Sequence, residues 1–204
     1  MPLKFPRPII YPITSGATTT PKILQLVRAA VDAEVPLFQI REKSLPARVL
    51  YELVVCAESI TRGSQTQLLV NDRSDIARAA GADGVHLTAH SLPADVVRKT
   101  CGPEFVIGVS THSREEAQAA RAGGADFVVF GPVFDTESKR AFGPPQGLAK
   151  LREVTRALDA FPVLAIGGIT LDNIAACLDA GASGVAGISL FNNAEIFLRL
   201  RNVL

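Results

Sequence analysis

Several short stretches of the sequence place cations, amides and hydroxyls at spacings that could bind phosphorylated ligands. In Gln39-Ile40-Arg41-Glu42-Lys43, alternation along an extended chain would put Gln39, Arg41 and Lys43 on one side. Two cations and an amide on one side could converge on a single anion. We therefore predict an anion site here, with a solvated strand end and an exposed ion pair as the alternative.

A carboxylate follows in Asn71-Asp72-Arg73. Asp72 could bind a hard cation such as Mg²⁺, or it could simply cap a helix that begins at Ser74. Further on, Ser110, Thr111 and His112 combine two hydroxyls with an imidazole. We interpret the two other histidines, His86 and His90, as a core residue and a surface residue.

Polar residues and glycines also mark the last third of the chain. Thr136, Ser138 and Lys139 lie in the irregular segment Val133–Pro145, and loops of that length are usually functional or mobile. Gly167-Gly168-Ile169 and Gly187-Ile188-Ser189 could let backbone N–H groups approach an anion, although a tight turn would also explain the paired glycines.

Each of these stretches follows a short apolar run, and such continuous runs are typical of parallel strands buried on both faces. The predicted strands are Ile9–Ile13, Leu37–Arg41, Gln67–Asn71, Gly84–Leu87, Phe105–Ser110, Phe127–Phe130, Val163–Gly167 and Gly184–Ile188. Between them the spacing predicts helices over Pro21–Ala33 (with Thr20 as its cap), Pro46–Thr61, Ser74–Ala80, Pro93–Thr100, Arg114–Ala122, Gln146–Leu158, Leu171–Ala180 and Ala194–Val203.

A weak internal repeat supports this assignment. The segments that start at Gly81, Gly124 and Gly181 share the pattern Gly-Ala-Asp/Ser followed by a strand. In each, the glycine is expected to end a helix in a left-handed cap.

Strict alternation of strands and helices predicts one domain over residues 1–204, an α/β fold that closes as a (β/α)8 TIM barrel. An open doubly wound sheet is the second choice, but no G-x-G-x-x-G follows the first strand. Barrel enzymes place their sites at the C-terminal ends of the strands, so the polar stretches above would share one mouth.

Composition excludes several classes of protein. A formal net charge of +1 gives no field that favours nucleic acid, and no apolar run is long enough to cross a membrane. The apolar content of 48% argues against disorder. The start of the chain lacks a signal-peptide pattern, and three scattered cysteines suit a reducing cytoplasm.

The motifs resemble the thiamine phosphate synthase and thiazole tautomerase family of barrels. The resemblance covers nearly the whole chain in order: YPIT at 11–14, QIREK at 39–43, VNDRSDIA at 70–77, GADGVHL at 81–87, IGVSTHS at 107–113, GADFVVFGPVFDTESK at 124–139, LAIGGIT at 164–170 and GASGVAGIS at 181–189. It implies a synthase that joins a pyrimidine-methyl diphosphate to a thiazole phosphate and releases diphosphate with Mg²⁺.

The resemblance also implies roles for individual residues. The diphosphate of the pyrimidine substrate would be held by Gln39, Arg41, Lys43, Asn71 and Lys139. Asp72 would bind Mg²⁺, and Ser110 would contact the pyrimidine and its diphosphate. The thiazole phosphate would be bound by Thr136, Ser138 and backbone groups around Gly168, Ile188 and Ser189. Lys139, Ser110 and His112 are the candidate catalytic residues.

One departure from the family pattern bears on the metal. The synthases usually carry an Asp as the second Mg²⁺ ligand at the position of Ser91, and Ala89 replaces a Gln. A hydroxyl is a poorer Mg²⁺ ligand than a carboxylate, so metal affinity should fall. Asp75 and Asp135 are candidate replacements that the sequence does not rank.

Two alternatives to the synthase stay open at this point. The tautomerase branch of the family lacks that metal site and uses a histidine matching His112 for proton transfer, whereas Lys43 and Asn71-Asp72 favour the synthase. A non-catalytic protein that binds a phosphorylated ligand is the other. We expect small phosphorylated molecules as partners, no nucleic acid and no membrane, and we allow for a homodimer.

Overall fold

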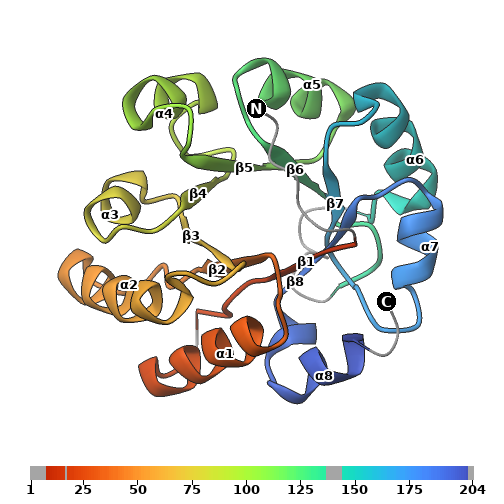
Figure 1. The fold of residues 1–204 in the computed structure, drawn as a ribbon. Coiled ribbons are helices and arrows are strands. Elements are labelled where there is room, and N and C mark those ends of the chain that lie inside the picture. Colours follow the sequence, from red (N-terminus) through yellow and green to blue (C-terminus); the bar gives the residue numbers. More distant parts are fainter. Residues whose placement is uncertain (1–7, 17, 137–143, 202–204) are drawn as a thin grey trace.

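The structure, a computed structural model, describes residues 8–16, 18–136 and 144–201. Its eight strands are β1 (Ile9–Pro12), β2 (Leu37–Ile40), β3 (Gln67–Asn71), β4 (Gly84–Leu87), β5 (Val106–Thr111), β6 (Phe127–Phe130), β7 (Val163–Ala165) and β8 (Gly184–Gly187). The helices are α1 (Thr20–Asp32), α2 (Ala47–Thr61), α3 (Ser74–Ala79), α4 (Ala94–Cys101), α5 (Arg114–Ala122), α6 (Gly147–Leu158), α7 (Ile174–Asp179) and α8 (Glu195–Arg201), with a 3₁₀ turn, η2, over Ser189–Phe191. Figure 1 shows the strands at the centre and the helices around them.

The strands form one parallel sheet in the order β1-β8-β7-β6-β5-β4-β3-β2. A bridge between Ile13 and Gln39 brings β1 to β2 and closes the ring. Every strand therefore lies beside its neighbours in sequence, which confirms the predicted (β/α)8 barrel and rules out the doubly wound sheet.

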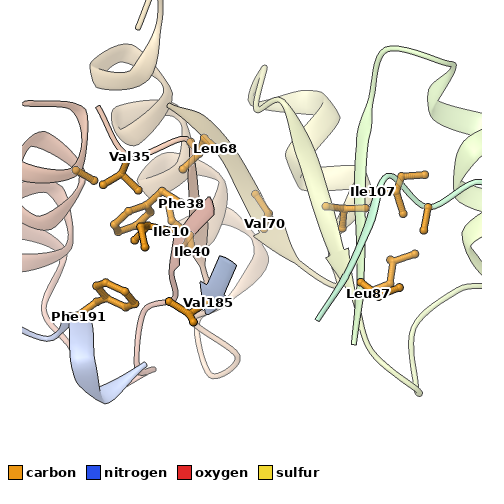
Figure 2. Packing of buried hydrophobic residues seen from close by; sticks show 14 of the residues in the cluster. Ile10, Val35, Phe38, Ile40, Leu68, Val70, Leu87, Ile107, Val185 and Phe191 are labelled. Carbon is orange, nitrogen blue, oxygen red and sulfur yellow. The ribbon is translucent and has the colours of Figure 1, made fainter. Parts of the chain in front are cut away.

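The protein has two apolar cores, one between the strands and the helices and one inside the barrel. Alternate strand residues such as Ile10, Phe38, Val70 and Ile107 face outward and pack against the helices, as Figure 2 shows. The other set fills the barrel interior: Ile9, Tyr11, Ile13, Leu37, Leu69, Val106, Phe127, Val129, Leu164 and Ala186. Because of this alternation, the inward-facing residues at the C-terminal ends of the strands line the mouth of the barrel, which is the opening at that end.

The Gly-Ala-Asp/Ser repeat is a turn with a defined hydrogen-bond pattern. Gly81, Gly124 and Gly181 have φ of +76°, +86° and +91°, which confirms the predicted left-handed helix ends. In two of the repeats the acidic side chain then accepts an N–H of the preceding strand, Asp83 from Leu68 and Asp126 from Ile107, each at 2.7 Å. The repeat therefore joins each helix to the N-terminal end of the barrel.

Most differences from the predicted elements lie at their ends. Thr19, not Thr20, precedes α1, and its side chain makes no capping hydrogen bond. The predicted start of α7 at Leu171 is wrong by three residues, because Asn173 bonds back to Thr170 and Gly168 before the helix begins at Ile174. The turn η2 was not predicted. Among the described residues, no helix is long and apolar enough to cross a membrane.

Candidate active site at the C-terminal mouth

Four neighbouring strands, β2 to β5, contribute polar side chains to the barrel interior near the C-terminal ends of the strands. Gln39 of β2 donates from Nε2 to Asn71 Oδ1 of β3 at 3.5 Å. His86 Nε2 of β4 and Ser110 Oγ of β5 share a hydrogen bond of 2.8 Å. The predicted residues Gln39, Asn71 and Ser110 are thus brought together, and His86 joins them.

Three buried polar atoms in this interior have no hydrogen-bond partner: Tyr11 Oη, Gln39 Oε1 and His86 Nδ1. An unpaired polar atom in a protein interior is costly and is rare outside functional sites. Tyr11 and His86 also face each other, with ring centroids 5.6 Å apart. These two residues were missed by the sequence reasoning, because each lies within an apolar strand that looks like core.

The interior groups are neutral at physiological pH. Burial lowers the pKa of His86 to about 3, and burial raises the pKa of the Tyr11 phenol well above its usual value. With the amides of Gln39 and Asn71 and the Ser110 hydroxyl, they make an uncharged polar wall. His86 is therefore not a proton donor or a cationic ligand at neutral pH.

The cations lie above this wall, at the rim. Arg41 is half-buried and Lys43 is exposed, and no carboxylate among the described residues forms an ion pair with either. β2 ends at Ile40, so strand alternation does not reach as far as Lys43. No described contact places Lys43 beside Gln39, and their convergence stays a prediction.

Asp72 occupies an unusual backbone conformation at the end of β3. Its φ is +64°, and its side chain is exposed. The capping alternative is wrong, because the N-cap of α3 is Arg73, not Asp72. Strained residues cluster at functional sites, and Asp tolerates the left-handed region better than most residues. The geometry therefore leaves the carboxylate available for a ligand.

The two candidate replacements for a second metal ligand, Asp75 and Asp135, differ in their surroundings. Asp75 forms an ion pair of 2.6 Å with Arg73, and the hydrogen bond from Arg73 lowers the pKa of its carboxyl. The Ser91 hydroxyl accepts the N–H of Thr88 at 2.8 Å within its own turn. Asp135 is exposed in the loop after β6. Among the described residues, no group of three or more His, Cys, Asp or Glu side chains could hold a metal without further ligands.

The loop after β6 packs tightly on the glycines that follow β7. Val133 and Phe134 donate backbone N–H groups to Ile166 and Gly167, at 2.8 and 3.0 Å. A Cβ on Gly167 would lie 2.5 Å from Pro132, and one on Gly168 would lie 2.6 Å from the carbonyl oxygen of Asp135. The close approach that requires glycine here is therefore made by the chain itself, which brings the half-buried Thr136 toward the end of β7.

The other predicted residues of this region lie at different places. Ile188 is half-buried, and the exposed Ser189 begins η2. Ser138 and Lys139 lie outside the described residues. His112 is exposed and donates from Nδ1 to the carbonyl of Gly131 at 2.5 Å.

His112 faces the helices rather than the interior of the barrel. It lines a cavity of about 200 Å³ with Phe130, Gln146, Lys150 and Val154, between α5 and α6. The interior pair is His86 with Ser110, so the imidazole that contacts Ser110 is not the one that the sequence singled out.

The fold and the mouth define a class: a (β/α)8 barrel with neutral polar groups below a cationic rim. The family model described as thiamine monophosphate synthase matches residues 10–191, and the chain belongs to this family.

Individual relatives agree with this assignment. Thiamine-phosphate synthase of Roseiflexus castenholzii is 44% identical over 92% of this chain and 83% of its own length. That of Moorella thermoacetica is 46% identical over 81% and 79%. The solved structure of thiamine phosphate pyrophosphorylase from Pyrococcus furiosus is 32% identical, with a TM-score of 0.83 over 96% of this chain and 94% of that one. The chain is therefore an enzyme, a transferase of thiamine biosynthesis, and these comparisons do not support the tautomerase or the non-catalytic alternative.

Proposed function

We propose that the C-terminal mouth catalyses the thiamine-phosphate synthase reaction, the joining of a hydroxymethylpyrimidine diphosphate to a thiazole phosphate. The bond between the pyrimidine methylene carbon and the diphosphate oxygen breaks, and the diphosphate leaves with the electron pair. The thiazole nitrogen then supplies the pair for the new C–N bond, so the protein need not transfer a proton.

The observation that supports this assignment is the layering of the mouth. Unpaired neutral atoms of Tyr11, Gln39 and His86 lie within the barrel, below Arg41 and Lys43 at the rim. An uncharged polar pocket suits an electron-poor pyrimidine methylene centre, and cations above it stabilise the charge that grows on the departing diphosphate. Placing the two kinds of group at different depths would separate the developing charges as the bond breaks.

The proposed roles follow this layering. Gln39, Asn71 and Ser110 bind the pyrimidine end and the adjoining diphosphate oxygens, while Arg41, Lys43 and Lys139 bind the outer diphosphate. Thr136, Ser138 and the backbone around Gly168, Ile188 and Ser189 bind the thiazole phosphate. His112, which follows β5 and bonds to the Gly131 carbonyl, stays a candidate catalytic residue.

Asp72 is the residue that would hold Mg²⁺. One protein carboxylate together with substrate phosphate oxygens is a mode in which Mg²⁺ often binds, and it suits the described residues, which offer no cluster of three or more His, Cys, Asp or Glu side chains. When bound there, the ion would neutralise charge on the leaving diphosphate. The proposed substrates are small phosphorylated metabolites, and we propose that the enzyme acts on them in the cytoplasm.

The test is the release of diphosphate from both substrates over a range of Mg²⁺ concentrations. No diphosphate at any Mg²⁺ concentration would contradict the proposal. Arg41→Ala should lower kcat/KM by about ten- to a hundredfold, because a charge-assisted hydrogen bond is lost. Arg48→Ala removes a cation from the exposed surface of α2 and should leave kcat/KM unchanged.

A further inference from the structure

The seam between β1 and β2 differs from every other seam of the barrel. Each of the other neighbouring strand pairs is joined by a parallel ladder of two to four residue pairs. β1 and β2 meet through the single bridge between Ile13 and Gln39, with the N–H of Thr14 donating to the Gln39 carbonyl at 3.0 Å. The backbone alone makes few bonds at this seam.

A threonine side chain adds one more hydrogen bond between the two strands at this seam. Thr14 is 3% exposed, and its Oγ1 accepts the backbone N–H of Arg41 at 2.7 Å. Its own N–H bonds to Gln39, so one residue holds the backbone on both sides of Ile40. The hydroxyl thus substitutes for a backbone carbonyl at the position where Arg41 leaves the strand.

A buried carboxylate holds the same loop from the other side. Glu42 is only 5% exposed, and its Oε1 accepts the N–H of Gly16 at 3.3 Å. A Cβ on Gly16 would lie 3.5 Å from the Arg41 carbonyl oxygen and 3.9 Å from its Nη1, so this loop runs beside both the backbone and the guanidinium of Arg41. Burial of a carboxylate is costly, which argues that Glu42 serves the arrangement of this loop.

We propose that Thr14 and Glu42 are positioning residues that aim Arg41 at the diphosphate. The proposal rests on the proposed function, since it assumes that Arg41 binds that group. The seam residues Gln39 and Arg41 are also the ones that carry the predicted anion site. A change at Thr14 or Glu42 should therefore act on the diphosphate-bearing substrate and not on the thiazole phosphate.

The first experiment compares Thr14→Val with Thr66→Val. Thr66 is equally buried, and its Oγ1 donates to the Val35 carbonyl at 2.7 Å at the opposite end of the barrel. Both variants lose one buried hydroxyl. Thr14→Val should raise the KM for the pyrimidine diphosphate about tenfold, because the Arg41 N–H loses its acceptor, and should leave the KM for the thiazole phosphate within about twofold. Thr66→Val should change neither KM.

Thr14→Ser keeps the hydroxyl oxygen and should bring the KM for the pyrimidine diphosphate back close to the wild-type value. Glu42→Ala leaves the bond between Thr14 and Arg41 in place and should raise the same KM as Thr14→Val does. An equal rise in both KM values, or no difference between Thr14→Val and Thr66→Val, would overturn the proposal. Either result would show that Thr14 only supports the fold.

Calorimetry with Mg²⁺ and inorganic diphosphate separates this inference from the proposed function. Thr14→Val should bind diphosphate about tenfold more weakly than the wild type, whether or not the enzyme turns over. Unchanged binding would refute the positioning role, while a wild type that binds diphosphate but releases none from the substrates would refute the proposed function alone.

Discussion

At the N-terminal end of the barrel, polar side chains bond to one another and to the backbone, whereas at the C-terminal end several of them are left without partners. Arg98 donates to the carbonyls of Gly102, Phe105 and Gly124 and to the carboxylate of Asp126. At the other end, Tyr11 Oη and Gln39 Oε1 have no partner at all. Among the described residues, Gln67 Oε1 at the N-terminal end is also unpaired.

We infer from this contrast that the N-terminal end stabilises the molecule and that the C-terminal end binds the ligand. Bonds that are complete in the free protein contribute to folding, while unpaired atoms cost stability until a ligand satisfies them. Variants at the lower end should therefore change unfolding, and variants at the upper end should change binding and turnover.

The largest effect is expected for Arg98→Ala. The substitution leaves several carbonyls and the Asp126 carboxylate without their donor, which should cost about 3 kcal/mol in the free energy of unfolding. Burial already raises the pKa of Asp126, so the unpaired carboxylate is disfavoured further. Urea unfolding measures the loss, with Arg73→Ala on the exposed Arg73–Asp75 pair as the control. The folded Arg98→Ala enzyme should keep its kcat/KM. A large loss of kcat/KM in the folded variant would contradict the division between a stabilising end and a ligand-binding end.

Gly108→Ala tests the packing beneath the mouth. An added Cβ would lie 2.3 Å from Phe127 Cζ and 2.8 Å from His86 Nδ1, so both rings must move. We expect a loss of about 2 kcal/mol from overpacking, together with a drop in kcat because His86 holds Ser110. Gly63→Ala meets no atom within 4 Å, although its φ is +77°. It should lower stability through backbone strain and leave kcat unchanged; a similar fall in kcat for both variants would contradict the argument.

The pH dependence of stability should report the neutral imidazole at the mouth. The pKa of His86 is about 3 in the folded protein against 6.5 for a free imidazole, so between these values the unfolded chain binds a proton that the folded protein does not. Stability conferred by the neutral form is thus lost as pH falls below 6.5, by about 2 kcal/mol between pH 7.5 and pH 5.

Urea unfolding of wild type and His86→Gln at these two pH values measures the difference. His86→Gln should lose less stability than the wild type on acidification. His90→Gln, at an exposed position, should behave as the wild type does. Equal losses in all three proteins would mean that His86 is not buried as a neutral group.

The sequence predicted the barrel well because buried parallel strands leave a strong local signal. The apolar runs and the Gly-Ala-Asp/Ser turns can each be recognised from adjacent residues alone, without knowledge of distant parts of the chain. Side-chain roles that depend on distant neighbours were not predictable in this way. His86 looks like a core residue in the run Gly84–Leu87, and only the neighbouring strand shows that it meets Ser110.

Burial of charge was also hidden from the sequence. Glu42 stands between Arg41 and Lys43, where a solvated carboxylate is expected, yet it is 5% exposed because the loop after β1 covers it. Similarly, the sequence gives no sign that position 168 requires glycine because of the neighbouring loop, and only the tertiary structure shows that a Cβ there would lie 2.6 Å from the carbonyl oxygen of Asp135. In both cases the missing information is the course of a loop.

The smallest effect concerns the metal site proposed at Asp72. Ser91→Asp should strengthen metal binding in the presence of inorganic diphosphate by about tenfold, because it adds a second charged ligand at the position where the resemblance to the family implies one. An Asp can accept the Thr88 N–H as Ser91 does, so the turn should be kept. Titration of Mn²⁺ followed by electron paramagnetic resonance measures the affinity without turnover.

His90→Asp adds the same charge one residue away and should have little effect. Equal gains in both variants would mean that the added charge acts at long range and not as a ligand, and no gain in Ser91→Asp would argue that the metal does not bind beside Asp72.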